Sequence, residues 1–193
     1  MTLIELLAAI TGLACVYLTT KEKISSFYVG FVNIALFIYM FIDAKLYADA
    51  TLQVVFAVLS FYGIYVWLSG NKNTKSVAIT RDITRNETLI SLAIGILASF
   101  GWAALLTKYT DASVPYIDAP LAVASVIAQW FLSKKVIQNW LIWITVDVFS
   151  VGMYAYKGLY ITSGLYAIFL MLAAKGFMDW RKENSYLATK TNA

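Results

Sequence analysis

The chain has 193 residues, of which 61% are hydrophobic and only 13% are charged, whereas soluble domains carry about 25% charged residues. Its 15 Lys and Arg against 11 Asp and Glu give a net charge of +4, which we interpret as membrane topology rather than as a nucleic-acid surface. The chain lacks histidine and has one cysteine, Cys15. An internal disulfide is therefore excluded, and the commonest general base and zinc ligand is missing, which argues against an enzyme.

Seven apolar segments are long enough to cross a hydrocarbon core of about 30 Å. The first carries Glu5 and has neither a preceding basic residue nor a cleavage site, so we expect it to be retained rather than removed as a signal peptide. The sequence therefore predicts an all-α polytopic membrane protein with seven transmembrane helices. In chain order the segments are 2–19, 24–42 and 46–69, then, after a polar loop, 87–107, 114–133, 136–156 and 158–178.

Basic residues are concentrated at one end of these segments, which holds twelve of the fifteen. The opposite end holds the other three, Lys45, Lys108 and Lys157, together with five acidic residues. Because Lys and Arg accumulate in cytoplasmic loops, the pattern predicts an outside N-terminus and a cytoplasmic C-terminus. The basic residues assigned to the cytoplasmic side are Lys21, Lys23, Lys72, Lys75, Arg81, Arg85, Lys134, Lys135, Lys175, Arg181, Lys182 and Lys190.

The chain also matches itself at one constant offset, which we call the repeat register, although a sequence this rich in Leu, Ala and Tyr also matches itself by chance. The register places the first, second and third segments on the fifth, sixth and seventh. It predicts two parallel three-helix repeats, in 1–70 and 111–193, joined by a cytoplasmic loop and connector helix in 71–110, with the substrate site near the midplane between the repeats. The matches include Lys21 with Lys134, Met40 with Met153, Gly63 with Gly176, and Trp67 with Trp180.

The sixth segment carries the most informative residues. Trp140, Trp143, Asp147, Ser150 and Tyr154 are spaced by three or four and share one helix face. An aspartate at a helix centre costs about 2.5–3.5 kcal/mol on insertion scales, so Asp147 should face a cavity or a partner. Aromatic rings with one carboxylate suit a planar cation. The alternatives are an interfacial role for Trp140 and a structural role, protonated or paired with lysine, for Asp147.

Three amides are further candidates for the substrate site: Asn139 on the sixth segment, Gln53 on the third and Asn33 on the second. Buried amides also bond between helices simply to hold them together. The chain has no phosphate-binding loop, metal-ligand cluster or nucleophile beside a histidine, so we expect no cofactor, no metal and no ATP. Proton coupling through Asp147 stays open.

The stretch QNWLIWITVDV, with Trp140 and Trp143, and the later KGLY at 157–160 resemble the Pnu family of vitamin transporters. The resemblance extends to 21–33 and 46–67. It implies a SWEET-like fold of two three-helix bundles and a linking helix, often assembled as a homotrimer. It also implies uptake of nicotinamide riboside by facilitated diffusion and trapping of the vitamin inside the cell by phosphorylation, while close relatives carry thiamine.

By the same resemblance, Asn139, Trp140, Trp143, Asp147 and Gln53 would contribute to the substrate site. Members associated with nicotinamide riboside tend to have asparagine where this chain has Asp147, so nicotinamide riboside and thiamine, both cationic aromatic compounds, stay open as substrates. We expect a transporter for a cationic vitamin in a bacterial inner membrane. The alternatives from other classes are a SWEET-like sugar carrier, a small channel, an intramembrane enzyme and an accessory subunit.

Overall fold

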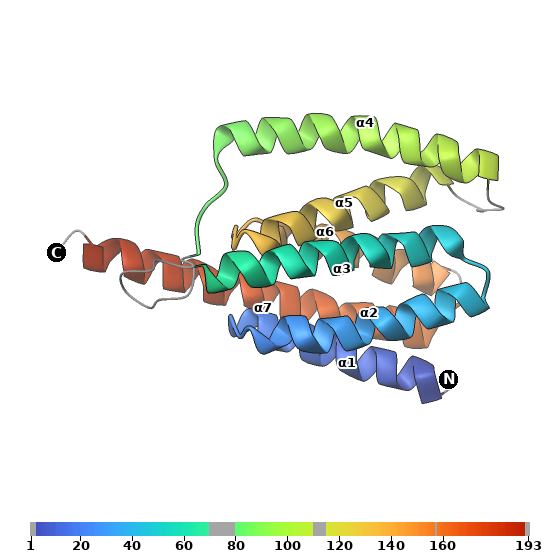
Figure 1. Cartoon of the computed structure of the whole chain (residues 1–193), viewed down its shortest axis with the longest axis horizontal. Coiled ribbons are helices and arrows are strands. Elements are labelled where there is room, and N and C mark those ends of the chain that lie inside the picture. Colours follow the sequence, from blue (N-terminus) through green and yellow to red (C-terminus); the bar gives the residue numbers. More distant parts are fainter. Residues whose placement is uncertain (1–2, 70–79, 110–114, 157, 192–193) are drawn as a thin grey trace.

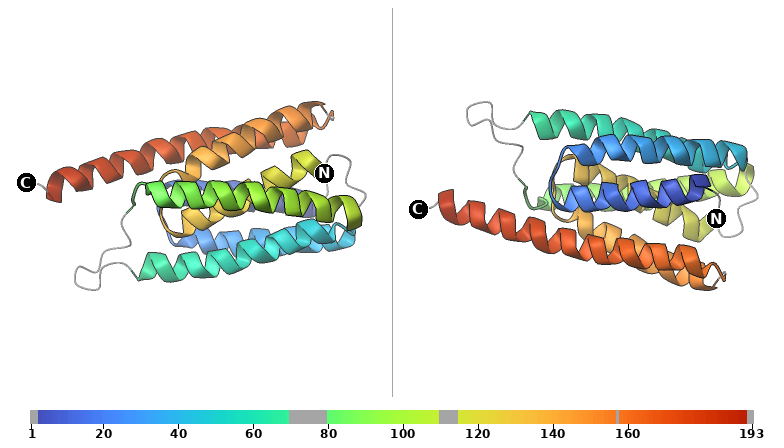
Figure 2. Two further views of the ribbon diagram at one scale, coloured as in Figure 1. Left: turned by 90° about the horizontal axis from the view of Figure 1, so that it is seen from above. Right: turned by 90° about the horizontal axis from the view of Figure 1, so that it is seen from below.

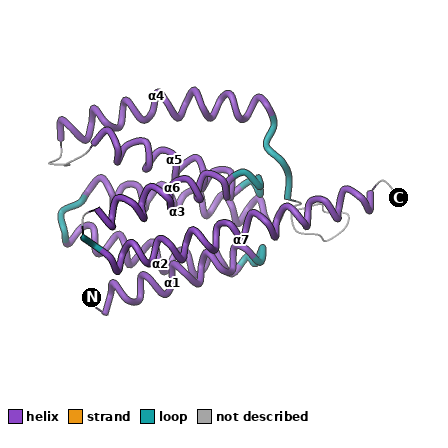
Figure 3. Tube along the Cα trace, turned by 180° about the vertical axis from the view of Figure 1, so that it is seen from behind, coloured by secondary structure: helices purple, strands orange, loops and turns teal. Residues whose placement is uncertain are grey.

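The structure is a computed structural model that describes residues 3–69, 80–109, 115–156 and 158–191. Several loop and tail residues to which the sequence assigns a membrane side, among them Lys72, Lys75 and Lys157, lie outside or at the edge of these ranges, and the side chain of Lys190 is not described. All seven regular elements of the described residues are helices (Figure 3). They are α1 (Leu3–Thr20), α2 (Ser25–Asp43), α3 (Tyr47–Leu68), α4 (Arg85–Tyr109), α5 (Pro115–Ser133), α6 (Asn139–Tyr156) and α7 (Tyr160–Thr191).

Six of these helices are long and apolar enough to span a membrane, and α6 is the exception. It has 18 residues, but Asn139, Asp147 and several aromatic residues make it more polar than the others. It nevertheless packs between α5 and α7 inside the bundle. The prediction of an all-helical membrane protein is confirmed. We expected seven helices apolar enough to span a membrane, and six of the seven are.

Six helices form a closed ring in the order α1, α2, α3, α5, α6 and α7, with α7 packed against α1. The remaining helix, α4, lies outside the ring and packs along α5 (Figures 1 and 2). The end of the bundle that holds the α1–α2 and α5–α6 turns also holds the start of α4, and the last turns of α7 project beyond it (Figure 1). Because Lys21, Arg81 and Lys134 lie there, we call it the basic end; the N-terminus lies at the other end.

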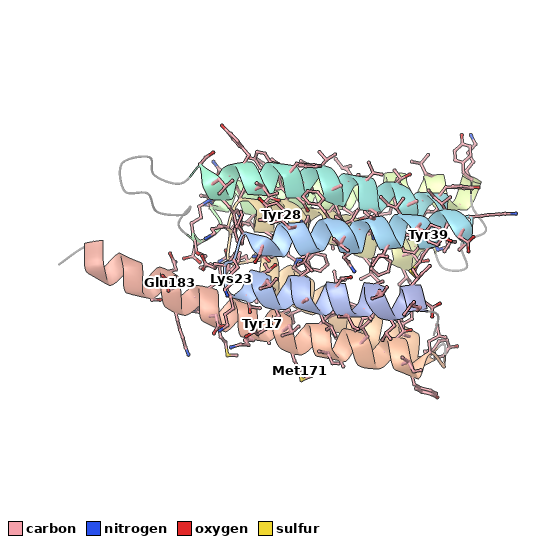
Figure 4. The ribbon with its side chains drawn as sticks, turned by 60° about the horizontal axis from the view of Figure 1, so that its bottom comes forward. Tyr17, Lys23, Tyr28, Tyr39, Met171 and Glu183 are labelled. Atoms are coloured by element: carbon pink, nitrogen blue, oxygen red, sulfur yellow. The ribbon has the colours of Figure 1, made fainter. Side chains whose placement is uncertain are left out.

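The surface of the bundle is apolar and much of its interior is small or polar, the reverse of a soluble protein. On α3, for example, Val58, Phe61 and Tyr65 are all more than half exposed, whereas Ser60 and Gly63 are buried. Tyr17, Tyr28, Tyr39 and Met171 also lie on the outer surface (Figure 4). Lipid solvates such a surface, and small buried residues let helices approach closely where there is no hydrophobic drive to associate.

Matching turns occur at positions that the repeat register pairs. Glu22 and Lys135 have positive φ angles of 52° and 54°, and Lys45 and Gly158 have 59° and 74°. In each turn, backbone N–H groups bond back to the last carbonyls of the preceding helix, which satisfies groups that would otherwise lack partners. The paired bonds are Glu22 N to Thr19 O and Lys135 N to Leu132 O, Lys23 N to Leu18 O and Val136 N to Phe131 O, and Leu46 N to Phe41 O and Leu159 N to Tyr154 O.

Aromatic rings pack directly on two glycines that the repeat register also pairs. A Cβ atom added to Gly63 would lie 2.6 Å from the Phe27 ring, and one added to Gly176 would lie 2.6 Å from the Trp140 ring. Only the absence of a side chain lets α3 approach α2, and α7 approach α6, this closely.

Two helix boundaries differ from the sequence prediction. We expected the sixth helix from residue 136, but α6 begins at Asn139, because Val136 and Ile137 belong to a turn whose backbone pairs with Arg81. We expected the last helix to end near 178, but α7 continues to Thr191. Its continuation is polar, so hydropathy could not detect it, yet water can solvate a helix that projects beyond the bundle.

The glycine contacts give a first prediction. Gly176→Ala should lower the free energy of unfolding by about 1–3 kcal/mol, because the new methyl group would overlap the Trp140 ring in a packed core. Thermal unfolding of the detergent-purified protein measures this. Gly164→Ala, on the same helix with nothing within 4 Å of the added Cβ, is the control and should leave the melting temperature unchanged or slightly higher. Equal melting temperatures for the two variants would contradict the packing argument.

Candidate functional site

The basic end of the bundle contains a tryptophan cluster, made of Phe27, Trp67, Trp140 and Trp180. The ring pairs Phe27–Trp67 and Trp140–Trp180 meet edge to face, with centroids 5.0 and 5.4 Å apart. Trp67 Nε1 donates to Leu132 O, and Trp180 Nε1 donates to Thr19 O, both at 3.2 Å. These contacts fix the ends of helices that lie far apart in the sequence.

Two sequence-predicted site residues, Asn139 and Trp140, lie at this tryptophan cluster. Both are fully buried, with 0% and 1% exposure. Asn139 Nδ2 donates to Val136 O at 2.7 Å within its own turn. Asn139 Oδ1 and Trp140 Nε1 have no hydrogen-bond partner among the described residues. Trp143, one turn further along α6, is half-buried and packs against the cluster from the membrane side.

Asp147 lies near the middle of α6 and is only 5% exposed. The face predicted from its spacing is confirmed as an inward face, since Trp140 and Ser150 are buried while Val148 and Phe149 are more than half exposed. Asp147 makes no hydrogen bond or ion pair within the described parts of the chain, so the lysine-paired alternative finds no support there. A buried carboxyl group without a protein partner is costly in a membrane helix, which makes Asp147 a candidate site residue.

Three aromatic rings on α6 and α7 contact one another between Asp147 and the end of the bundle opposite the basic end. Tyr154 of α6 stacks on Tyr166 of α7 with centroids 5.2 Å apart, and Tyr166 meets Phe169 edge to face at 5.9 Å. Asp147 interacts electrostatically with Tyr166. A buried carboxyl group and three rings in mutual contact therefore occur where α6 meets α7, a combination that suits a planar cation.

Asn33 approaches the same region from α2. Its Nδ2 donates to Ala8 O at 2.7 Å and to Thr11 Oγ1 at 3.0 Å, which ties α2 to α1. A Cβ atom added to Gly12 would lie 3.3 Å from Phe169 and 3.4 Å from Asn33 Nδ2, so α1, α2 and α7 meet at this point. We define the midbundle cluster as Gly12, Asn33, Asp147, Tyr154, Tyr166 and Phe169.

Among the sequence-predicted residues, the structure thus brings Asn33 and Asp147 to one level and leaves Asn139 and Trp140 at the basic end. Gln53 lies on α3 and is half-buried, and it forms no hydrogen bond with the midbundle cluster among the described residues. Sequence reasoning missed Tyr166 and Phe169. The repeat register pairs Tyr166 with Gln53 and Phe169 with Phe56, so carrying the helix 3 candidates across the repeat would have found both.

The family model described as nicotinamide mononucleotide transporter matches residues 2–182, nearly the whole chain. The chain belongs to this family. It is therefore a membrane transporter and not an enzyme, and its apolar helices make it a multi-pass protein of the bacterial inner membrane.

Relatives of this transporter family agree over most of their length. The chain is 28% identical to the nicotinamide riboside transporter PnuC of Escherichia coli, over 92% of this chain and 84% of that protein. It is 24% identical to PnuC of Neisseria mucosa, over 91% and 70%. It is also 24% identical to the riboflavin/roseoflavin transporter RibM of Streptomyces davaonensis, over 91% and 83%.

The fold is likewise that of a transporter. The crystal structure of the vitamin B3 transporter PnuC superposes on the chain with a TM-score of 0.75 at 22% identity, and the match covers 93% of this chain and 81% of that one. The resemblance to Pnu transporters expected from the sequence is confirmed by these findings.

The different surroundings of the two tryptophans give a second prediction. Trp140→Ala should lower the free energy of unfolding by about 3–5 kcal/mol, since it empties a buried site against Gly176. Trp143→Ala should leave the protein folded and weaken vitamin binding by about 2 kcal/mol, roughly thirtyfold in Kd, because the sequence predicts that this ring contacts the substrate. Thermal unfolding and titration calorimetry on both variants measure the two effects. Unchanged affinity in Trp143→Ala would remove this residue from the site.

Proposed function

We propose that this chain takes up a cationic vitamin, nicotinamide riboside, by facilitated diffusion, and that phosphorylation inside the cell traps the vitamin. The observation that carries the proposal is Asp147, buried near the middle of α6 without a partner among the described residues and interacting electrostatically with Tyr166 of the Tyr154–Tyr166 pair. Support for the vitamin itself comes from the relatives named nicotinamide riboside transporters, which the chain matches over more than nine tenths of its length.

In this proposal each part of the substrate has a counterpart in the chain. The Asp147 carboxylate balances the charge of the pyridinium ring, while Trp143 and the rings of the midbundle cluster contact its faces. Asn33 Oδ1 accepts no hydrogen bond from the described residues, so it is available to a ribose hydroxyl. Gln53 and Asn139 would serve as further polar contacts once the helices rearrange around the substrate, as the family resemblance implies.

We also propose a SWEET-like architecture of two parallel three-helix repeats, α1–α3 and α5–α7, joined by α4. The matching turns and the matching glycine contacts at positions paired by the repeat register support it. So does the ring order, in which every packed pair of the first three helices has an equivalent pair in the last three. The domain boundaries predicted at 70 and 110 follow from the same proposal.

The proposed orientation places the basic end in the cytoplasm and the N-terminus outside. Lys21, Arg81, Lys134 and Arg181 lie at the basic end, which supports it through the positive-inside rule. A homotrimer is proposed from the family resemblance.

Two other vitamins are candidates at the same site. Thiamine is also a cationic aromatic compound, so the midbundle cluster suits it equally, and the change from asparagine to Asp147 leaves it open. Riboflavin is the second candidate, because the sequence identity to RibM is comparable to that of the PnuC relatives. Riboflavin is uncharged and does not need the carboxylate, and a sugar carried by a SWEET-like protein would not need it either.

Uptake into liposomes tests the function. Purified protein should carry labelled nicotinamide riboside down its gradient, reach equal concentrations on both sides, and show the same rate with and without a proton gradient. Thiamine and riboflavin, offered separately and as competitors, rank the alternatives. Accumulation above the outside concentration would contradict facilitated diffusion, and transport of none of the three would contradict the vitamin proposal.

The charge of Asp147 gives a further prediction. Asp147→Asn should weaken binding of nicotinamide riboside by about 1.5–3 kcal/mol, roughly tenfold to a hundredfold in Kd, because a charge-assisted contact is lost. Thr145→Ala, on the lipid-facing side of the same helix, is the matched control and should bind as the unmodified protein does. A neutral substrate would bind Asp147→Asn with unchanged affinity, which would favour the flavin or sugar alternatives.

A further inference from the structure

The segment from Thr80 to Thr84, which leads into α4, lies across the basic end of the bundle. Its backbone pairs with the α5–α6 turn, since Arg81 N donates to Lys135 O at 3.0 Å and Ile137 N donates to Arg81 O at 2.9 Å. Thr80 Oγ1 donates to Glu22 Oε1 in the α1–α2 turn at 2.9 Å. The segment, which we call the strap, therefore connects a turn of the first three helices to a turn of the last three.

Side chains fasten the strap further. Gln138 Nε2 donates to Asp82 Oδ1 at 2.8 Å, and Asn184 Nδ2 of α7 donates to Asp82 Oδ2 at 3.1 Å. At the end of the strap, Thr84 and Glu87 form a capping box that starts α4. The strap is thus held at both ends.

An ion pair lies beneath the strap. Lys135 Nζ donates to Glu22 Oε2, and the same ammonium lies 4.6 Å from the centroid of the Trp67 ring. The Lys135 side chain is only 1% exposed, whereas that of Glu22 is 23% exposed. Removing Glu22 alone would leave a buried ammonium without its carboxylate, so this contact connects the two turns strongly.

Other hydrogen bonds join the two groups of three helices at this same end. Besides the Trp67 and Trp180 bonds, Ser133 Oγ donates to Leu59 O at 2.8 Å, and Gln129 Nε2 donates to Ser60 Oγ at 3.2 Å. Lys21 Nζ lies 3.7 Å from Asp179 Oδ2 between the α1–α2 turn and α7. The basic end is therefore closed by polar contacts that reach across the bundle.

At the opposite end, two acidic side chains, Asp49 of α3 and Asp118 of α5, interact electrostatically. Opposite charges and hydrogen bonds fasten the basic end, whereas no ion pair between described residues joins the helices at the other end.

We propose that the strap and the Glu22–Lys135 pair form the cytoplasmic gate of this transporter, closed in this structure. This inference rests on the proposed function, because it assumes a substrate that leaves the midbundle cluster towards the basic end. Opening requires the α1–α2 turn to separate from the strap, from the α5–α6 turn and from α7. The ion pair, the Thr80–Glu22 bond and the Lys21–Asp179 contact then break, while the backbone pairing of Arg81 with the α5–α6 turn stays.

A gate must part during each transport cycle, whereas a structural fastening never does, and a reversible crosslink distinguishes the two. In a Cys15→Ser background, the pair Lys21→Cys with Asp179→Cys places thiols on the α1–α2 turn and on α7, at partly exposed positions. A short bis-methanethiosulfonate reagent joins them, and a reductant releases them. The crosslinked protein should bind nicotinamide riboside with unchanged affinity but transport it no faster than empty liposomes, and reduction should restore transport.

The matched control is Lys175→Cys with Asp179→Cys, which shares one position but joins two residues of α7, one turn apart. Its crosslink does not cross the gate, so its transport should be the same before and after reduction. Full transport by the crosslinked Lys21–Asp179 pair would overturn the gate. Failure of the unmodified protein to transport any of the three vitamins would instead overturn the proposed function.

A second measurement detects opening directly. Ser133, two residues before the Lys135 carbonyl that pairs with the strap, is fully buried, and in the same background Ser133→Cys reports access from the basic end to a membrane-impermeant maleimide. Adding Glu22→Gln with Lys135→Met removes both charges of the pair together, which avoids a lone buried charge. The labelling rate should then rise about tenfold, because the open state gains population. An unchanged rate in a folded protein would overturn the role of the ion pair.

Discussion

Hydrocarbon cannot form hydrogen bonds, and the rest of this structure depends on that constraint. Every backbone polar group within the membrane must find its partner within its own helix, so the described chain is built from helices. Lipid also removes the hydrophobic drive for helices to associate, so contact depends on close fit. The rings of Phe27 and Trp140, packed on Gly63 and Gly176, supply that fit.

The same constraint makes each polar side chain within the bundle informative. The Asn33 amide group donates a hydrogen bond to α1, whereas Asp147 has no such partner in the described chain. The first residue can be explained by helix association alone, but the second cannot. A buried carboxyl group without a protein partner is unfavourable, and a bound cation would offset that cost, which is why the proposed site includes Asp147.

The general fold could be predicted from the sequence because hydropathy and lysine placement report directly on lipid contact. The span predicted for 24–42 agrees with α2 to within one residue at each end. The contacts of Trp140 could not be predicted, because a tryptophan at that depth is compatible with a substrate site, an interface or a core. Pairing between Arg81 and the α5–α6 turn was also hidden, since a short backbone bridge has no sequence pattern. Tyr166 could have been found through the repeat.

Positions that the repeat register pairs differ in how far they have diverged. The residues that set close packing match in kind, as Trp67 does with Trp180 and Gly63 with Gly176. The residues at the level of the binding site do not: Asn33 pairs with Val146, Ile34 with Asp147, and Gln53 with Tyr166. A two-fold related scaffold would offer a ligand two equivalent poses. Because the paired positions at the centre differ, the proposed site would hold a molecule with one charged end and one sugar end in a single orientation.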